Sequence, residues 1–100
     1  AKGFDTFCPL GPVIETEFDP ASAARVVTRV NGDERQSAPL TDLMFPIAEL
    51  IAYASSVFTL LPGDVIMTGT PAGVGPLVAG DEVEVEVEGI GVLRNTVRDA

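Results

Sequence analysis

Residues 82–88 read EVEVEVE, a strict alternation of glutamate and valine. Successive side chains of a β-strand point to opposite faces of the sheet, so the valines share one face and the glutamates share the other. A helix would scatter both kinds of side chain around its axis, because its period is 3.6 residues. The alternation therefore predicts a strand with one apolar face and one solvated, acidic face. Four neighbouring carboxylates repel one another too strongly to act as a catalytic pair.

Two further segments predict strands. Residues 92–98, VLRNTVR, follow the turn Gly89-Ile90-Gly91 and return as a strand. Earlier, residues 24–30, ARVVTRV, are rich in β-branched side chains and lead into Asn31-Gly32 and then DERQS. Asn-Gly suits the two central positions of a type I′ turn, where φ is positive. We therefore predict a hairpin around Asn31-Gly32.

One helix is predicted at residues 45–59, which carry apolar side chains at helical spacing: Ile47, Leu50, Ile51, Ala54 and Phe58. Pro46 suits the first helical turn, and Thr41 or Asp42 is the expected cap. Pro62-Gly63 ends the segment.

Short strands are expected at residues 13–16 and 64–68, the second of them buried. Residues 1–12 form a predicted loop of defined shape, because they include residue types that are usually buried: Phe4, Phe7, Cys8 and Leu10. Strands dominate and one helix accompanies them. The predicted fold class is therefore α+β, with a β-rich mixed sheet or roll and one main helix.

Charge and residue types exclude several classes of function. The net charge of −9 disfavours nucleic acid and anionic membranes as partners, because phosphate binding needs clustered lysine and arginine. No apolar run approaches the roughly 18–20 residues that span a bilayer. The absence of histidine from the sequence excludes a Ser-His-Asp triad, a Cys-His pair and an imidazole zinc site within this chain. The single cysteine, Cys8, cannot form an internal disulfide, which fits a reducing cytoplasm.

Hydrophobic residues make up 46% of the chain, more than a small compact domain normally buries. Two interpretations stay open. Either a partner or further chain covers part of the apolar surface, or the chain is simply rich in valine and alanine.

The loop GTPAGVGP at residues 69–76 is the first candidate site. Gly-rich loops expose backbone N–H groups to anions, and Thr68 and Thr70 add hydroxyl donors. The loop lacks the Gly-Lys-Ser/Thr ending of a Walker A motif, so a carboxylate is a better ligand than a polyphosphate. By spacing alone, a plain connection between strands is the simpler interpretation.

Two other features admit both a functional and a simpler interpretation. Lys2 lies beside a glycine and an aromatic residue, where partial desolvation would sharpen its charge, but a solvated terminal lysine is the simpler view. Glu15 and Glu17 would share one face of a strand and have a spacing seen in metal sites. No third ligand is obvious near them, so a solvated strand edge is the simpler view.

Taken together, these segments resemble the fumarylacetoacetate hydrolase (FAH) family. The resemblance covers almost the whole chain, in the family's order, and the stretch at 61–75 is its most specific part. The matching stretches are KGFDTFCPLGP at 2–12, the Asn-Gly hairpin followed by RQ at 35–36, LMFPIAELIAYAS at 43–55, LPGDVIMTGTPAGVG at 61–75 and GDEVEVEVEGIGVLRNTV at 80–97.

The resemblance implies a reaction class and site residues. Members of the family act on 2-oxo or diketo acids and need Mg²⁺ or Mn²⁺ as a Lewis acid and template. Lys2 matches the lysine that helps polarise the substrate, and Gly69 and Thr70 match the loop that receives the substrate carboxylate. The resemblance also implies a homodimer and a role in aromatic catabolism.

The family's metal carboxylates, a Glu-x-Glu pair and a later Asp, normally precede the KGFDTF-type segment, so the resemblance assigns no metal ligand to this chain. We expect residues 1–100 to be the C-terminal portion of a FAH-like catalytic domain, an incomplete domain that does not catalyse alone. The intact enzyme is expected to be a C–C bond hydrolase or an isomerase of the 2-hydroxyhepta-2,4-diene-1,7-dioate type. The alternatives are an oxaloacetate decarboxylase or acylpyruvase of the same family, and a catalytically inert association module.

Overall fold

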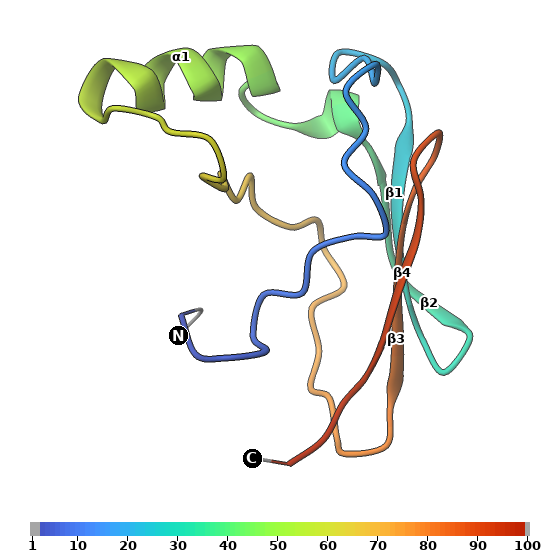
Figure 1. Ribbon diagram of the computed structural model, residues 1–100. Helices are drawn as coiled ribbons and strands as arrows, with labels where there is room; N and C mark the ends of the chain where they lie inside the picture. Colours follow the sequence, from blue (N-terminus) through green and yellow to red (C-terminus); the bar gives the residue numbers. More distant parts are fainter. Residues whose placement is uncertain (1–2, 100) are drawn as a thin grey trace.

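The computed structural model describes residues 3–99, which form one four-stranded sheet, one α-helix and long connecting segments (Figure 1). In chain order the elements are β1 (Arg25–Val30), β2 (Asp33–Pro39), a 3₁₀ turn (Leu40–Asp42), α1 (Ile47–Val57), β3 (Glu82–Val87) and β4 (Gly91–Thr96). The strand order is β2-β1-β3-β4, and every neighbouring pair is antiparallel. The predicted α+β class with one main helix is confirmed, and the sheet is antiparallel rather than mixed.

Asn31 and Gly32 form the tip of the β1–β2 hairpin, as predicted. Their φ angles are 51° and 84°, the positive values that a type I′ turn requires. Asn31 also ties the tip to β3. Its backbone N–H donates to the Glu82 carbonyl at 2.8 Å, and its side-chain oxygen accepts from the Glu82 N–H at 2.9 Å. The hairpin is therefore fixed to a third strand at its turn.

A β-bulge interrupts the pairing of β1 with β2. Thr28 pairs with Gln36, and the next residue, Arg29, pairs with Glu34, so that Arg35 is an extra residue on β2. A bulge bends its strand and re-aims the side chains beside it. Here Arg35 and Gln36 both line a pocket on one side of the sheet.

One face of the sheet carries the valines predicted from the alternation, and we call it the valine face. Its central rows place Val26, Thr28 and Val30 of β1 beside Val87, Val85 and Val83 of β3. Among residues 3–99, Val30 is the one buried hydrophobic residue, at 5% exposure, and its neighbours on this face are half-buried. The segments that cross the valine face therefore cover it only in part.

On the opposite face, which we call the glutamate face, arginines pair with the glutamates. The alternation did not predict these arginines. Arg29 on β1 donates to Glu86 at 2.7 Å, and Arg94 on β4 donates to Glu84 at 2.9 Å. The side chain of Glu84 is only 15% exposed, so this face is less solvated than expected. Hydrogen bonding to Glu86 raises the pKa of Arg29, and hydrogen bonding to Glu84 raises the pKa of Arg94.

The helix α1 is two residues shorter at each end than the predicted range of 45–59. Pro46 immediately precedes its first turn, and no side chain caps it. The expected caps, Thr41 and Asp42, lie in the 3₁₀ turn instead. At the other end, the Phe58 N–H donates to the Ala54 carbonyl at 2.8 Å and closes the last turn.

The helix stands away from the sheet (Figure 1). Its most inward side chains, Ile47, Leu50 and Ala54, are only half-buried, whereas Ile51 and Tyr53 are exposed. Large apolar side chains are also exposed outside the helix, including Ile14 at 94% and Met44 at 91%. In residues 3–99 the amphipathic surface of α1 therefore has no close-packed partner.

Two predicted strands are wrong, and so is the burial expected of four side chains in the N-terminal loop. Residues 13–16 and 64–68 pair with no strand among the described residues, because the sheet is completed by its four members alone. An extended segment without a pairing partner is not a stable strand. The N-terminal residues expected to be buried are exposed instead: Phe4, Phe7, Cys8 and Leu10. The rings of Phe4 and Phe7 contact each other, with centroids 5.3 Å apart.

No helix within residues 3–99 has the length and apolar character needed to cross a bilayer.

Candidate functional site

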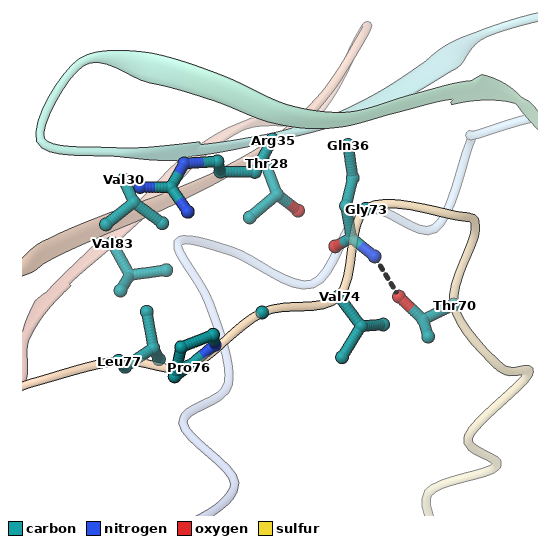
Figure 2. Close-up of a pocket in the computed structure, with 11 residues that line it drawn as sticks. Thr28, Val30, Arg35, Gln36, Thr70, Gly73, Val74, Pro76, Leu77 and Val83 are labelled. Atoms are coloured by element: carbon teal, nitrogen blue, oxygen red, sulfur yellow. Dashed lines mark hydrogen bonds between the residues drawn. The ribbon is translucent and has the colours of Figure 1, made fainter.

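A pocket of about 280 Å³ lies between the valine face and the Gly-rich loop (Figure 2). Three strands, the loop and the residue after the loop contribute its walls: Thr28, Val30, Arg35, Gln36, Thr70, Gly73, Val74, Gly75, Pro76, Leu77 and Val83. Most of these side chains are apolar, and the hydrogen-bonding groups among them come from Thr28, Arg35, Gln36 and Thr70. An apolar pocket with a few converging polar groups is the usual form of a small-molecule site.

Thr70 is held in place from the sheet by Gln36. The Gln36 side-chain nitrogen donates to the Thr70 hydroxyl oxygen at 2.7 Å and to the Pro71 carbonyl at 2.8 Å. Figure 2 shows Gln36 reaching from β2 to the loop, with the first of these bonds dashed. Thr70 itself is exposed, whereas Gln36 and Pro71 are half-buried. The hydroxyl is therefore both accessible and anchored.

Two glycines allow the backbone conformation of the loop. Gly73 has φ of 110° and lies against the bulge of β2, where a Cβ would overlap the carbonyl oxygen of Arg35. Gly69 has φ of 98°, a conformation that L side chains rarely adopt, although a Cβ there would meet open space. The first glycine is thus required by close approach and the second by backbone conformation.

The segment that follows Lys2 approaches the same side of the sheet. A Cβ on Gly11 would lie 3.3 Å from the Leu93 side chain, and one on Gly91 would lie 3.1 Å from Pro12. Leu93 and Gly91 pair with Val85 and Val87 on the valine face. Figure 1 shows the N-terminal segment and the Gly-rich loop on one side of the sheet. Lys2, the predicted catalytic residue, lies outside the described residues.

No group of three or more Asp, Glu, Cys or His side chains within residues 3–99 is arranged to hold a metal ion. The Glu15 carboxylate bends back and accepts the Glu17 N–H at 2.8 Å, and this segment is not a strand. The carboxylates of β3 are engaged by Arg29 and Arg94. The described residues do not by themselves fit a divalent metal.

Gln36 and Arg35 are the site residues that reasoning from the sequence missed. The segment DERQS has no apolar alternation, and such a polar strand is typical of a solvent-facing sheet edge. The bulge that turns Arg35 and Gln36 onto one face has no signature in residue type. The available signal was the RQ pair itself, which belongs to one of the stretches that resemble the FAH family.

Solved structures with this fold include enzymes. A 5-carboxymethyl-2-hydroxymuconate delta-isomerase from Mycobacterium smegmatis superposes with a TM-score of 0.93 at 54% identity, over 100% of this chain and 40% of its own. A maleylpyruvate hydrolase from Sphingobium sp. SYK-6, in complex with manganese(II) and pyruvate, gives 0.88 at 46% identity, over 95% and 37%. The fold is therefore one used by isomerases and hydrolases of small organic acids.

The sequence model of the fumarylacetoacetate (FAA) hydrolase C-terminal domain matches residues 1–98, and the chain belongs to this family. The mitochondrial oxaloacetate tautomerase FAHD2A of Bos taurus is 45% identical over 105 residues, which is 96% of this chain and 33% of that protein. The chain spans about two fifths of the length of the first curated relatives it matches.

Proposed function

We propose that the chain is the C-terminal portion of a FAH-family enzyme that uses Mg²⁺ or Mn²⁺ and acts on 2-oxo acids, diketo acids or 2-hydroxy-diene dioates. The reaction is C–C bond hydrolysis or isomerisation. The observation that carries the proposal is the accessible Thr70 hydroxyl, which is anchored by Gln36 and lines a mostly apolar pocket. The isomerase and the hydrolase with the same fold are consistent with either reaction.

In this proposal the Gly69-Thr70 loop binds the substrate carboxylate. The Thr70 hydroxyl is a neutral donor in a chain of net charge −9, and it offers a hydrogen bond without adding a competing negative charge. The positive φ of Gly69 lets the backbone pass the ligand without a side chain in the way. Val74 and Leu77 line the pocket and offer apolar contact to the carbon skeleton of the acid.

Lys2 is assigned the second role. Its ammonium group stabilises the negative charge that develops on the substrate oxygen when an enol or enolate forms, a stabilisation that is stronger in the transition state than in the bound substrate. Hydrolysis also needs an activated water, whereas isomerisation or decarboxylation needs only proton delivery to an enolate. Residues 3–99 offer no group that selects between these outcomes.

In this proposal the metal ligands come from the part of the enzyme that precedes these 100 residues. The manganese in the related maleylpyruvate hydrolase supports a divalent ion in the family. We further propose that the rest of the catalytic domain packs on the exposed apolar surface around α1, that the enzyme is a homodimer, and that it works in the cytoplasm. The unpartnered side chains of Ile51, Tyr53 and Met44 support such packing.

A second candidate is favoured by the same apolar surface: a catalytically inert module whose function is association. If the intact protein is an enzyme, an oxaloacetate decarboxylase or an acylpyruvase of the same family is the alternative to an enzyme for diene dioates. The oxaloacetate tautomerase relative supports an activity on oxaloacetate. Turnover separates these candidates, because the association module turns over none of the three substrate classes.

The test assays the intact protein that contains this chain with 2-hydroxyhepta-2,4-diene-1,7-dioate, acylpyruvates and oxaloacetate, with Mg²⁺ or Mn²⁺ and after chelation. Lys2→Ala is expected to lower kcat on the accepted substrate by a factor of about 10²–10³, the usual cost of one transition-state donor. Its thermal unfolding should match the wild type. Unchanged kcat would refute the role of Lys2, and no turnover of any of these acids would favour the association module.

A further inference from the structure

We propose that Gln36 is a positioning residue that directs the hydroxyl proton of Thr70 toward the substrate carboxylate. This inference rests on the proposed function, because it names what sets the direction of the carboxylate-binding hydroxyl. Gln36 does not touch the substrate in this scheme. It acts through Thr70.

The orientation of the Gln36 amide follows from its two partners. The Pro71 carbonyl can only accept a hydrogen bond, so the amide group 2.8 Å from it must be the –NH₂ end. The same nitrogen lies 2.7 Å from the Thr70 hydroxyl oxygen. An –NH₂ group has two hydrogens, and these two acceptors use both of them.

These two bonds fix the direction of hydrogen bonding at the Thr70 hydroxyl. Its oxygen accepts from Gln36, so its own hydrogen has to point elsewhere, and Thr70 donates no hydrogen bond within residues 3–99. A hydroxyl that already accepts one bond is a better donor, because hydrogen bonds in a chain polarise one another. A substrate carboxylate has no hydrogen to donate and needs such donors.

The fold holds Gln36 in a position from which its amide can donate to the Thr70 oxygen. Gln36 pairs with Thr28 on the valine face, directly beside the extra residue Arg35 of the bulge. Gly73 of the same loop packs against the Arg35 carbonyl, so the loop lies directly against β2. The half-buried Gln36 amide therefore lies between β2 and the loop, within hydrogen-bond distance of both Thr70 and Pro71.

The experiment measures the affinity of the intact protein for pyruvate by isothermal titration with saturating Mn²⁺. Pyruvate is the probe because it carries the 2-oxo carboxylate and is bound with manganese in the related hydrolase. Thr70→Val is expected to raise Kd about tenfold through loss of the donor. Gln36→Met, which keeps the length of the side chain but removes the amide, is expected to raise Kd by a similar factor.

The double variant tests whether the two residues act as a unit. If Gln36 works through Thr70, the combined Thr70→Val and Gln36→Met protein has the Kd of Thr70→Val alone, about tenfold above wild type. Ser37→Ala is the matched control. Ser37 is the next residue on β2, and its hydroxyl accepts from Arg25 without a contact to the loop. This control should bind pyruvate as the wild type does.

Steady-state kinetics add a readout that a purely structural role would not give. Gln36→Met should raise KM for the accepted substrate and leave kcat within about twofold, as loss of uniform binding does. Gln36→Glu provides a second variant of nearly the same shape. It should weaken pyruvate binding at least as much as Gln36→Met does, because its carboxylate accepts the hydrogen bond of the Thr70 hydroxyl. The thermal midpoint of each variant is measured in parallel.

Three results would overturn the inference, and they are distinguishable. In the first, Gln36→Met binds pyruvate with the wild-type Kd while Thr70→Val raises Kd. This result removes the role of Gln36 and leaves the proposed function standing. Kd losses that multiply to about a hundredfold in the double variant show that Gln36 acts independently of Thr70. No change of Kd in Thr70→Val removes the carboxylate-binding role of the loop, and the inference with it.

Discussion

Gly73 lies against Arg35 so closely that a β-carbon on the glycine would overlap the carbonyl oxygen of the arginine. This contact joins the Gly-rich loop to the bulge of β2, although Gly73 and Arg35 are 38 positions apart in the chain. The loop is therefore held to the sheet by backbone contact, and the Gln36–Thr70 hydrogen bond forms beside it.

Gly73→Ala is the first prediction. The alanine would have to keep φ of 110° and displace the Arg35 carbonyl, so we expect a loss of about 1–3 kcal/mol in the free energy of unfolding. Urea unfolding of the intact protein measures it. Gly75→Ala is the control, because a Cβ there meets only the Arg35 guanidinium at an ordinary 3.8 Å. Equal losses in both variants would contradict the close-approach explanation.

A second prediction concerns Asn31, which combines a positive φ with hydrogen bonds to Glu82 and, at 2.8 Å, to Asp81. Asn31→Ala should cost about 1–3 kcal/mol, since alanine loses the side-chain bonds and is strained at positive φ. Asn31→Gly removes the same bonds without the strain and should cost less. The two free energies of unfolding, compared at equal temperature, separate the contributions, and a glycine variant less stable than the alanine variant would refute this division.

The third prediction concerns Arg29, which pairs with Glu86 at 2.7 Å and lies near Glu84 and Glu34. Arg29→Gln leaves these carboxylates uncompensated, so the thermal midpoint should fall at low salt. The deficit should shrink in 1 M NaCl, where the screening length is only about 3 Å. Arg98→Gln controls for the change in net charge, because Arg98 makes no ion pair within the described residues. A deficit that is independent of salt would show that Arg29 acts through packing instead.

Acidification supplies the fourth prediction. The hydrogen bond from the Val78 N–H, followed by that from Asn31, lowers the pKa of Asp81 below its usual value of 3.8. The folded state therefore holds this proton more weakly than the unfolded state. The resulting stability is present above the unfolded pKa and is lost as the pH falls through the folded pKa.

Asp81→Asn should consequently flatten the dependence of unfolding free energy on pH below about pH 4, although the variant is less stable at neutral pH. Asp42→Asn is the control, since the Asp42 side chain makes no hydrogen bond within residues 3–99. Denaturant titrations at several pH values measure both. A slope as steep in Asp81→Asn as in the wild type would contradict the prediction.

The sequence predicted those parts of the fold that depend on neighbours in the chain. The alternation of 82–88 and the Asn31-Gly32 turn are local signals, and both were confirmed. The strand predicted at 64–68 was wrong because a strand exists only with a partner, and local composition does not identify one. The placement of β1 between β2 and β3 is a non-local fact of the same kind.

For the candidate site, the resemblance pointed to Gly69 and Thr70, whose roles stay predictions, and the structure shows Gln36 and Arg35 beside the loop. Gln36 was not predicted, because a glutamine on a polar edge strand resembles any solvated side chain until the bulge and the loop place it beside Thr70. The arginines of the glutamate face were missed for a similar reason. Their partners lie 57 and 10 positions away, on neighbouring strands.

The pairing of β1 with β3 has a consequence for how this domain tolerates insertions. The Asn31–Glu82 contact closes a loop of 51 positions, and the entropy of loop closure rises only with the logarithm of length. Doubling the length of the segment from Leu40 to Asp81 would raise the free energy of loop closure by about 0.6 kcal/mol. Insertions that lengthen or rebuild the helix in this segment are therefore compatible with the same sheet. A single residue inserted in β2 has the opposite effect. It would shift the register and turn every later side chain of that strand to the other face.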